Sequence, residues 1–233
     1  MMKDLITQSP QLTRTETIAG WSYYAFSMLA LPIVLNYANG AVGNILNDAQ
    51  LNFVFYAANF LAVCLIFSRF LRANLSVAGR RLFPTVWYAL LGYLGSGALQ
   101  RIMTWLILLV APRFVNINDM SIAAMAGQER TLTFVGTVFL VPVAEEVFYR
   151  GLLFRYLSGR SRWLAYAVSI TVFALVHVTG YIGSASALTL LLCFLQYLPA
   201  GYCLAWCYAN TGTIITPILM HMIVNAYGIS AMR

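Results

Sequence analysis

Residues 140–150 form the stretch Leu140-Val141-Pro142-Val143-Ala144-Glu145-Glu146-Val147-Phe148-Tyr149-Arg150, in which three charged side chains interrupt an otherwise apolar run. The chain of 233 residues is 61% hydrophobic and contains only seven acidic residues. On insertion scales, a charged side chain at the centre of a membrane helix costs about 2.5 to 3.5 kcal/mol. Packing alone does not explain two adjacent glutamates and an arginine at that cost. The stretch therefore predicts an intramembrane reaction site.

Only 9% of the residues are charged, against about 25% in soluble globular domains. Apolar runs of the roughly 20 residues that cross a bilayer recur along the whole sequence. We therefore predict an all-α, polytopic transmembrane helix bundle of about seven spans (six to eight) in a single membrane-embedded domain, 1–233. The candidate spans are about 18–39, 51–68, 84–111, 132–154, 163–180, 187–209 and 213–230.

The net charge of +7 does not form one patch, because the arginines gather at the ends of the apolar runs. We therefore expect the lipid bilayer as a partner and no nucleic acid. An N-terminus in the cytoplasm satisfies the positive-inside rule, which predicts a multi-pass protein of the cell membrane in that orientation. The basic residues inside would be Lys3, Arg14, Arg69, Arg72, Arg80, Arg81, Arg155, Arg160 and Arg162, against Arg113, Arg130 and Arg233 outside.

Two segments allow more than one prediction. The stretch 116–130 mixes polar and apolar residues and fits either an amphipathic helix on the outer surface or an ordinary loop. The candidate span 84–111 is too long for a simple crossing, so it could be tilted, broken or re-entrant. Within it, Arg101 could face a polar cavity, snorkel to the interface or lie beyond a misdrawn boundary.

The spacing of the charged residues assigns different roles to the two glutamates. Successive side chains on a helix point about 100° apart, so Glu145 and Glu146 cannot both face one partner. Glu146 and Arg150 are four residues apart, the spacing at which an acid and a following base meet. Glu145 is left without a local partner in a low-dielectric setting and is our candidate general base. The structural alternative is a buried ion-pair network that only orients helices.

The chain has only two histidines, and both lie in apolar segments. Phe173 precedes His177 by one helical turn, and His221 precedes Asn225 by one turn. Polar side chains in three separate membrane segments are best satisfied if they meet, so we expect these groups to converge with the glutamates. Counting about 1.5 Å per residue places Glu145 and His221 at about 13 Å depth, but His177 at about 22 Å.

This set of groups is typical of a hydrolase that uses activated water. It supplies a carboxylate base, an imidazole to shuttle the proton, and neutral donors for an oxyanion. Zinc is the alternative activator, since Glu145, His177 and His221 form a known type of ligand set. The local His-Glu-x-x-His pattern is missing. We favour an enzyme without a required cofactor and keep zinc as the alternative.

The motifs Glu-Glu-x-x-x-Arg (Glu145, Glu146, Arg150), Phe-x-x-x-His (Phe173, His177) and His-x-x-x-Asn (His221, Asn225) together resemble one known signature. It is that of the CAAX protease and bacteriocin-processing enzyme family, relatives of the type II CAAX prenyl endopeptidase. The resemblance covers about 130–229 and implies a protease core there, preceded by N-terminal helices, 1–129, without a motif. It implies Glu145 as the water-activating base assisted by His177, an oxyanion site of His221 and Asn225, and a supporting role for Glu146, Arg150 and Phe173.

The resemblance implies an intramembrane endopeptidase that hydrolyses a peptide bond of a membrane-associated or hydrophobic peptide or protein. Bacterial relatives are associated with peptide maturation, bacteriocin immunity and membrane signalling, so we expect a bacterial membrane protein. The alternative is a non-catalytic immunity or adaptor protein that binds another membrane protein. A transporter with a proton relay through Glu145 and His177 would also bury these groups, but the sequence shows no internal repeat.

Overall fold

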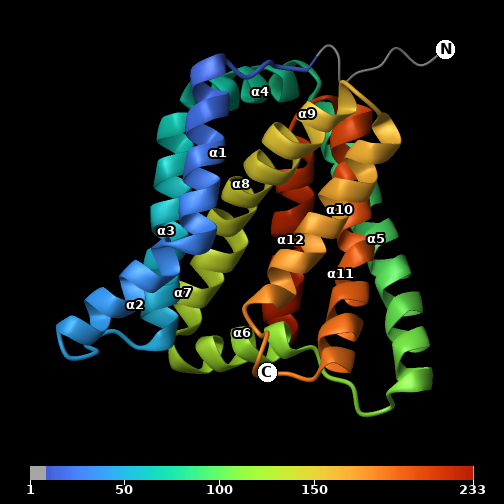
Figure 1. Cartoon of the computed structure of the whole chain (residues 1–233). Coiled ribbons are helices and arrows are strands. Elements are labelled where there is room, and N and C mark those ends of the chain that lie inside the picture. Colours follow the sequence, from blue (N-terminus) through green and yellow to red (C-terminus); the bar gives the residue numbers. More distant parts are fainter. Residues whose placement is uncertain (1–8, 233) are drawn as a thin grey trace.

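The computed structural model describes residues 9–232 as a bundle of helices (Figure 1). The only strand-like pairing in this part of the chain is an isolated bridge between Ile182 and Ala185. The predicted all-α class is confirmed. The helices are α1 (Arg14–Leu29), α2 (Leu31–Ala41), α3 (Asp48–Ile66), α4 (Ser68–Arg80), α5 (Leu82–Val110), α6 (Ile117–Gln128), α7 (Arg130–Val135), η1 (Gly136–Leu140), α8 (Val141–Glu146), η2 (Val147–Phe154), α9 (Arg155–Ser158), α10 (Arg162–Thr179), α11 (Ala187–Thr211) and α12 (Ile215–Ala231).

Each of the seven predicted spans falls on a helix, but fewer are long enough to cross a bilayer alone. Five segments of the described chain are long and apolar enough to cross a membrane. The bent pair of α1 and α2 makes a sixth if it is one span. One of the five, Arg130–Ser158, runs without interruption from α7 to α9. The seventh predicted span is the shorter apolar helix α12. The structure therefore supports a polytopic membrane protein with five or six such spans.

The first predicted span is broken between α1 and α2. The two helices meet at 49° around Ala30, and α2 extends away from the other helices (Figure 1). Pro32 stands in the first turn of α2, where a residue without an N–H is tolerated because that group has no helical partner. The break therefore follows from a proline that starts a new helix.

The third predicted span is one unbroken helix of 29 residues, α5. The broken and re-entrant alternatives are wrong. Its length of roughly 43 Å exceeds a hydrocarbon core of about 30 Å, which favours a tilted helix. Arg101 is exposed on α5, so it does not face a buried polar cavity.

Residues 117–128 form the helix α6, so the loop alternative for this stretch is wrong. The helix runs across one end of the bundle, next to the C-terminal end of α12 (Figure 1). Its N-cap, Asn116, accepts hydrogen bonds from the backbone N–H groups of Asn118 and Asp119. This capping satisfies the first free donors of α6 and fixes where the helix begins.

Most elements that carry the predicted cytoplasmic arginines lie at one end of the bundle. α4 and α9 are there, together with the first turns of α1 and α10, and α6 lies at the opposite end (Figure 1). Lys3 and Arg233 lie outside the described residues. The orientation of the N-terminus stays a prediction.

Because α5 packs closely against α11 and α12, adding one methyl group at Gly92 is expected to lower the stability of the protein. A Cβ atom on Gly92 would lie 2.4 Å from Cys207 Sγ and 2.8 Å from Met220 Sδ. Gly92→Ala should therefore destabilise the protein by about 1 to 3 kcal/mol through overpacking. Thermal unfolding of the purified protein in detergent measures the change. The matched control is Gly95→Ala on the same helix, where the nearest side-chain atom is 3.8 Å away; equal unfolding temperatures for the two variants would contradict the packing argument.

Candidate active site

The two glutamates end the short helix α8, between two π-helical segments. η1 precedes α8 and η2 follows it. Pro142 near the start of α8 has no N–H to donate to the preceding turn, and the N–H of Val141 bonds to the carbonyl of Gly136, five residues earlier. π-helical turns are rare in proteins overall, but those that occur are often found at functional sites. Here they set the rotation of Glu145 and Glu146 relative to the neighbouring helices.

Glu146 and Arg150 form the ion pair expected from their spacing. Arg150 Nη1 donates to Glu146 Oε1 over 3.0 Å, and both side chains are fully buried. Arg150 Nη2 donates over 3.0 Å to the carbonyl oxygen of Gly201 on α11. The guanidinium carbon also lies 5.0 Å from the ring centre of Phe173. Arg150 therefore joins its own helix to α10 and α11, the two helices packed beside it.

His221 lies between the two carboxylates. Its Nδ1 atom is 2.9 Å from Glu146 Oε1, and its Nε2 atom is 4.0 Å from Glu145 Oε2. Because an ionised carboxylate only accepts hydrogen bonds, Nδ1 carries the proton, and in a neutral ring Nε2 carries the lone pair. His221 therefore presents an acceptor toward Glu145.

Asn225 lies one turn further along α12 and contacts the η1 segment. Its Nδ2 atom donates to the carbonyl oxygen of Thr137 over 2.8 Å. An amide nitrogen carries two hydrogens, so one donor remains for another acceptor. The hydroxyl oxygen of Thr137 is buried and has no hydrogen-bond partner within residues 9–232.

His177 makes its contacts with Phe173 and Tyr197 and not with the glutamates in the described chain. Its Nδ1 atom donates over 2.8 Å to the carbonyl oxygen of Phe173, and its ring centre lies 4.3 Å from that of Tyr197. In the described chain no hydrogen bond or ion pair joins His177 to Glu145 or His221. Phe173 lies between the two histidines, and its ring centre is 6.0 Å from that of His221.

Helix α6 supports Tyr197 through its first residues. The Tyr197 hydroxyl accepts a hydrogen bond from Asn118 Nδ2 over 2.9 Å and donates to Asp119 Oδ1 over 3.4 Å. The same Asn118 side chain accepts from the Tyr181 hydroxyl over 3.2 Å. The sequence did not single out Tyr197, because nothing local to α11 distinguishes it from the other tyrosines. The mixed polarity of 116–130 was the only signal for this contact.

Glu145 faces a cavity of about 270 Å³. Glu145 is 22% exposed, and its Oε2 atom is buried without a hydrogen-bond partner in the described chain. Val176 and Thr179, on either side of His177, line the same cavity. The opposite wall comes from α1, α2 and α3, a part of the chain that contains no residue predicted for the site. It consists of Tyr24, Ser27, Met28, Pro32, Phe55, Tyr56 and Asn59.

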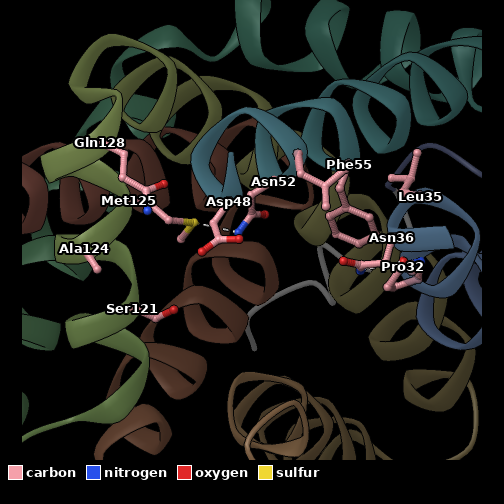
Figure 2. Close-up of a pocket in the computed structure, with 11 residues that line it drawn as sticks. Pro32, Leu35, Asn36, Asp48, Asn52, Phe55, Ser121, Ala124, Met125 and Gln128 are labelled. Carbon is pink, nitrogen blue, oxygen red and sulfur yellow. Dashed lines mark hydrogen bonds between the residues drawn. The ribbon is translucent and has the colours of Figure 1, made fainter. Parts of the chain in front are cut away.

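A larger cavity of about 400 Å³ lies between α2, α3 and α6. Figure 2 shows its polar lining, including Asp48 and Gln128, and the hydrogen bond from Asn52 to Met125. The glutamates do not line it, but Pro32 and Phe55 line both cavities. The two cavities therefore share a wall.

The zinc alternative requires at least three ligand side chains that converge on one point. Within residues 9–232 no three His, Cys, Asp or Glu side chains are grouped closely enough to hold one metal ion. His221 is near both glutamates, but His177 turns its ring to Tyr197. The predicted set Glu145, His177 and His221 does not fit a metal ion in this arrangement.

These features define a multi-pass helical membrane protein with a polar site buried inside the bundle. Residues 127–227 match the family model described as type II CAAX prenyl endopeptidase, Rce1-like. This match confirms the resemblance predicted from the three motifs and is consistent with the CAAX protease and bacteriocin-processing enzyme family.

One curated protein is similar to part of the chain. The UPF0177 protein YxdF of Lactococcus lactis subsp. lactis (strain IL1403) is 29% identical over 94 residues, which are 40% of this chain and 46% of the relative. The matched region thus covers less than half of either protein. No solved structure matches the chain.

Proposed function

We propose that this protein is an intramembrane endopeptidase that hydrolyses a peptide bond of a hydrophobic or membrane-associated peptide. The observation that carries the proposal is the free Oε2 atom of Glu145, which faces a cavity and lies 4.0 Å from His221 Nε2. A membrane protease family matches the segment that supplies both residues. The bilayer and a peptide substrate are the partners that such a site requires.

The nucleophile is a water molecule that bridges Glu145 and His221. A water oxygen about 2.8 Å from each atom fits atoms that are 4.0 Å apart. Glu145 takes one proton from this water as its oxygen forms a bond to the substrate carbonyl carbon. His221 accepts a hydrogen bond from the other water hydrogen at Nε2. This contact turns a lone pair of the water oxygen toward the substrate carbonyl carbon. Glu146 holds the His221 ring through Nδ1, and Arg150 neutralises Glu146.

The remaining steps use donors around the same cavity. The second Nδ2 hydrogen of Asn225 stabilises the oxyanion, since Thr137 occupies only the first. The proton held by Glu145 passes to the leaving nitrogen as the C–N bond breaks, which yields a carboxylic acid and an amine. His177 assists from the end of α10, where its Nε2 atom is free to exchange a proton because Nδ1 donates to Phe173.

Two further assignments belong to this proposal. The chain forms a single membrane-embedded domain in which α1, α2 and α3 complete the cavity around the core that holds the motifs. The N-terminus faces the cytoplasm, because the positive-inside rule favours that side for the arginine-rich end of the bundle.

A comparison of membranes from cells that express the wild-type protein or Glu145→Gln tests the proposal. We expect peptide termini that appear with the wild-type protein and are absent with Glu145→Gln, because an amide cannot take the proton from water. Mass spectrometry of membrane peptides and newly released termini measures this difference. Equal amounts of each protein in the membrane are required, so both are quantified in the same samples.

The matched control is Glu129→Gln, a glutamate at the end of α6 that lines neither cavity. Membranes with Glu129→Gln should contain the same peptide termini as membranes with the wild-type protein. Identical termini in all three samples would favour the immunity or adaptor alternative over the protease.

A further inference from the structure

The cavity wall opposite Glu145 contains a buried polar residue with no assigned role. Asn59 on α3 is 6% exposed and lines this cavity together with Glu145. It lies outside residues 127–227, the segment that matches the protease family. Neither the three motifs nor the family match therefore accounts for its position.

The orientation of the Asn59 amide is fixed by one contact. Nδ2 donates over 2.9 Å to the carbonyl oxygen of Phe55, one turn earlier on α3. A carbonyl oxygen only accepts, so the nitrogen must point to Phe55 and Oδ1 must point elsewhere. Oδ1 is buried and has no hydrogen-bond partner in the described chain. Buried polar atoms in folded proteins are nearly always paired, so this acceptor calls for a ligand.

The surroundings of Asn59 indicate the chemistry of that ligand. Aromatic rings of Tyr24, Phe55, Tyr56 and Phe148 line the same cavity, which therefore favours apolar groups. The partner of Oδ1 must be a hydrogen-bond donor carried by such a group. A peptide backbone in extended form offers this combination, since its N–H groups are free, whereas those of a helix are bonded internally.

We propose that Asn59 is a substrate-binding residue whose Oδ1 atom accepts a hydrogen bond from a backbone N–H of an extended apolar peptide segment. This inference rests on the proposed function, because it places the peptide in the cavity of Glu145. The inference adds that the substrate backbone is extended, and not helical, next to the bond that is cleaved. Asn59 places a contact on α3 that selects for the extended backbone.

Binding to a catalytically blocked protein tests this inference without turnover. The probe is a fluorescein-labelled decapeptide of alternating valine and alanine between terminal lysine pairs, added to the Glu145→Gln protein in lipid nanodiscs. Fluorescence anisotropy gives its Kd. We expect Asn59→Leu to weaken binding about tenfold, because one buried hydrogen bond is lost.

A second series of peptides removes the donor instead of the acceptor. Each central amide is N-methylated in turn, and one methylation should weaken binding to the Asn59 protein about tenfold. The same methylation should change the Kd of Asn59→Leu less than twofold, because the shared hydrogen bond is already absent. If Asn59→Leu does not fold, Asn59→Ala takes its place in the same comparison, because it also removes the Oδ1 acceptor.

The matched control is Asn210→Leu. Asn210 Nδ2 donates to the carbonyl oxygen of Trp206 over 2.8 Å, which is the same contact within a helix, but Asn210 lines neither cavity. Its Kd should be unchanged. The inference is overturned if Asn59→Leu binds as tightly as the Asn59 protein, if no methylation has an effect that depends on Asn59, or if no saturable binding is observed.

The two proposals can fail separately. If the protein with Glu145 intact does not cleave the bound decapeptide while the Asn59 dependence holds, hydrolysis of this peptide is refuted and the binding role stands. If cleavage depends on Glu145 but binding does not depend on Asn59, only the role of Asn59 is refuted.

Discussion

Replacing Arg150 by methionine is expected to destabilise the protein by about 3 to 5 kcal/mol, because a buried carboxylate loses its cation. Glu146 and Arg150 are both fully buried, and within the described chain Glu146 Oε1 accepts hydrogen bonds from Arg150 and His221. The methionine would also remove the hydrogen bond from Arg150 to the Gly201 carbonyl. Denaturation by sodium dodecyl sulfate in mixed micelles, followed by circular dichroism, measures the free energy of unfolding.

The control for this prediction is a second arginine–glutamate pair, in which the arginine is exposed and the glutamate, Glu16, is buried. Arg69 lies 3.4 Å from Glu16, but its side chain is 60% exposed. Arg69→Met should change the free energy of unfolding by less than about 1 kcal/mol, since Arg69 is exposed and Glu16 keeps its hydrogen bonds from Thr13 and from the backbone N–H of Phe70. The double variant Glu146→Met with Arg150→Met should recover part of the loss, because it removes both charges. If it is as unstable as Arg150→Met alone, the unpaired charge is not the cause.

Local spacing was enough to predict the Glu146–Arg150 pair, because four residues of helix place both side chains on one face. Counting residues along the spans was enough to place Glu145 and His221 at one depth, and their side chains are 4.0 Å apart. His177 was expected to meet the glutamates, although the same count set it at a different depth, and in the described chain it contacts Phe173 and Tyr197 instead. Contacts along one helix, or at one level of the bilayer, were therefore readable from the sequence.

Other contacts depend on how helices are rotated and packed. The sequence contained no sign that Glu146, and not Asn225, would bind His221, since the rotation of α8 follows from the π-helical turns around Pro142. It gave none for Asn59 either, because a single asparagine in an apolar helix has no motif around it. Only the packing of α1, α2 and α3 on the glutamate helix places Asn59 beside the cavity of Glu145.

Replacing His221 by asparagine is expected to lower kcat by about 100- to 10,000-fold with little change in stability, because it removes the second contact of the water. The amide nitrogen of asparagine stands near the place of Nδ1 and can still donate to Glu146, whereas nothing replaces Nε2 beside Glu145. Cleavage of a peptide found with the wild-type protein measures kcat, and thermal unfolding measures stability.

The comparison with His177→Asn decides which histidine shares the water with Glu145. His177 Nδ1 donates to the Phe173 carbonyl, a bond that asparagine can also make, so this variant removes only the free Nε2. The geometry predicts a smaller loss of kcat than for His221→Asn, since His177 has no contact with Glu145 in the described chain. A larger loss for His177→Asn would instead place the water between Glu145 and His177, as the family resemblance implies. His221 would then return to the oxyanion site beside Asn225.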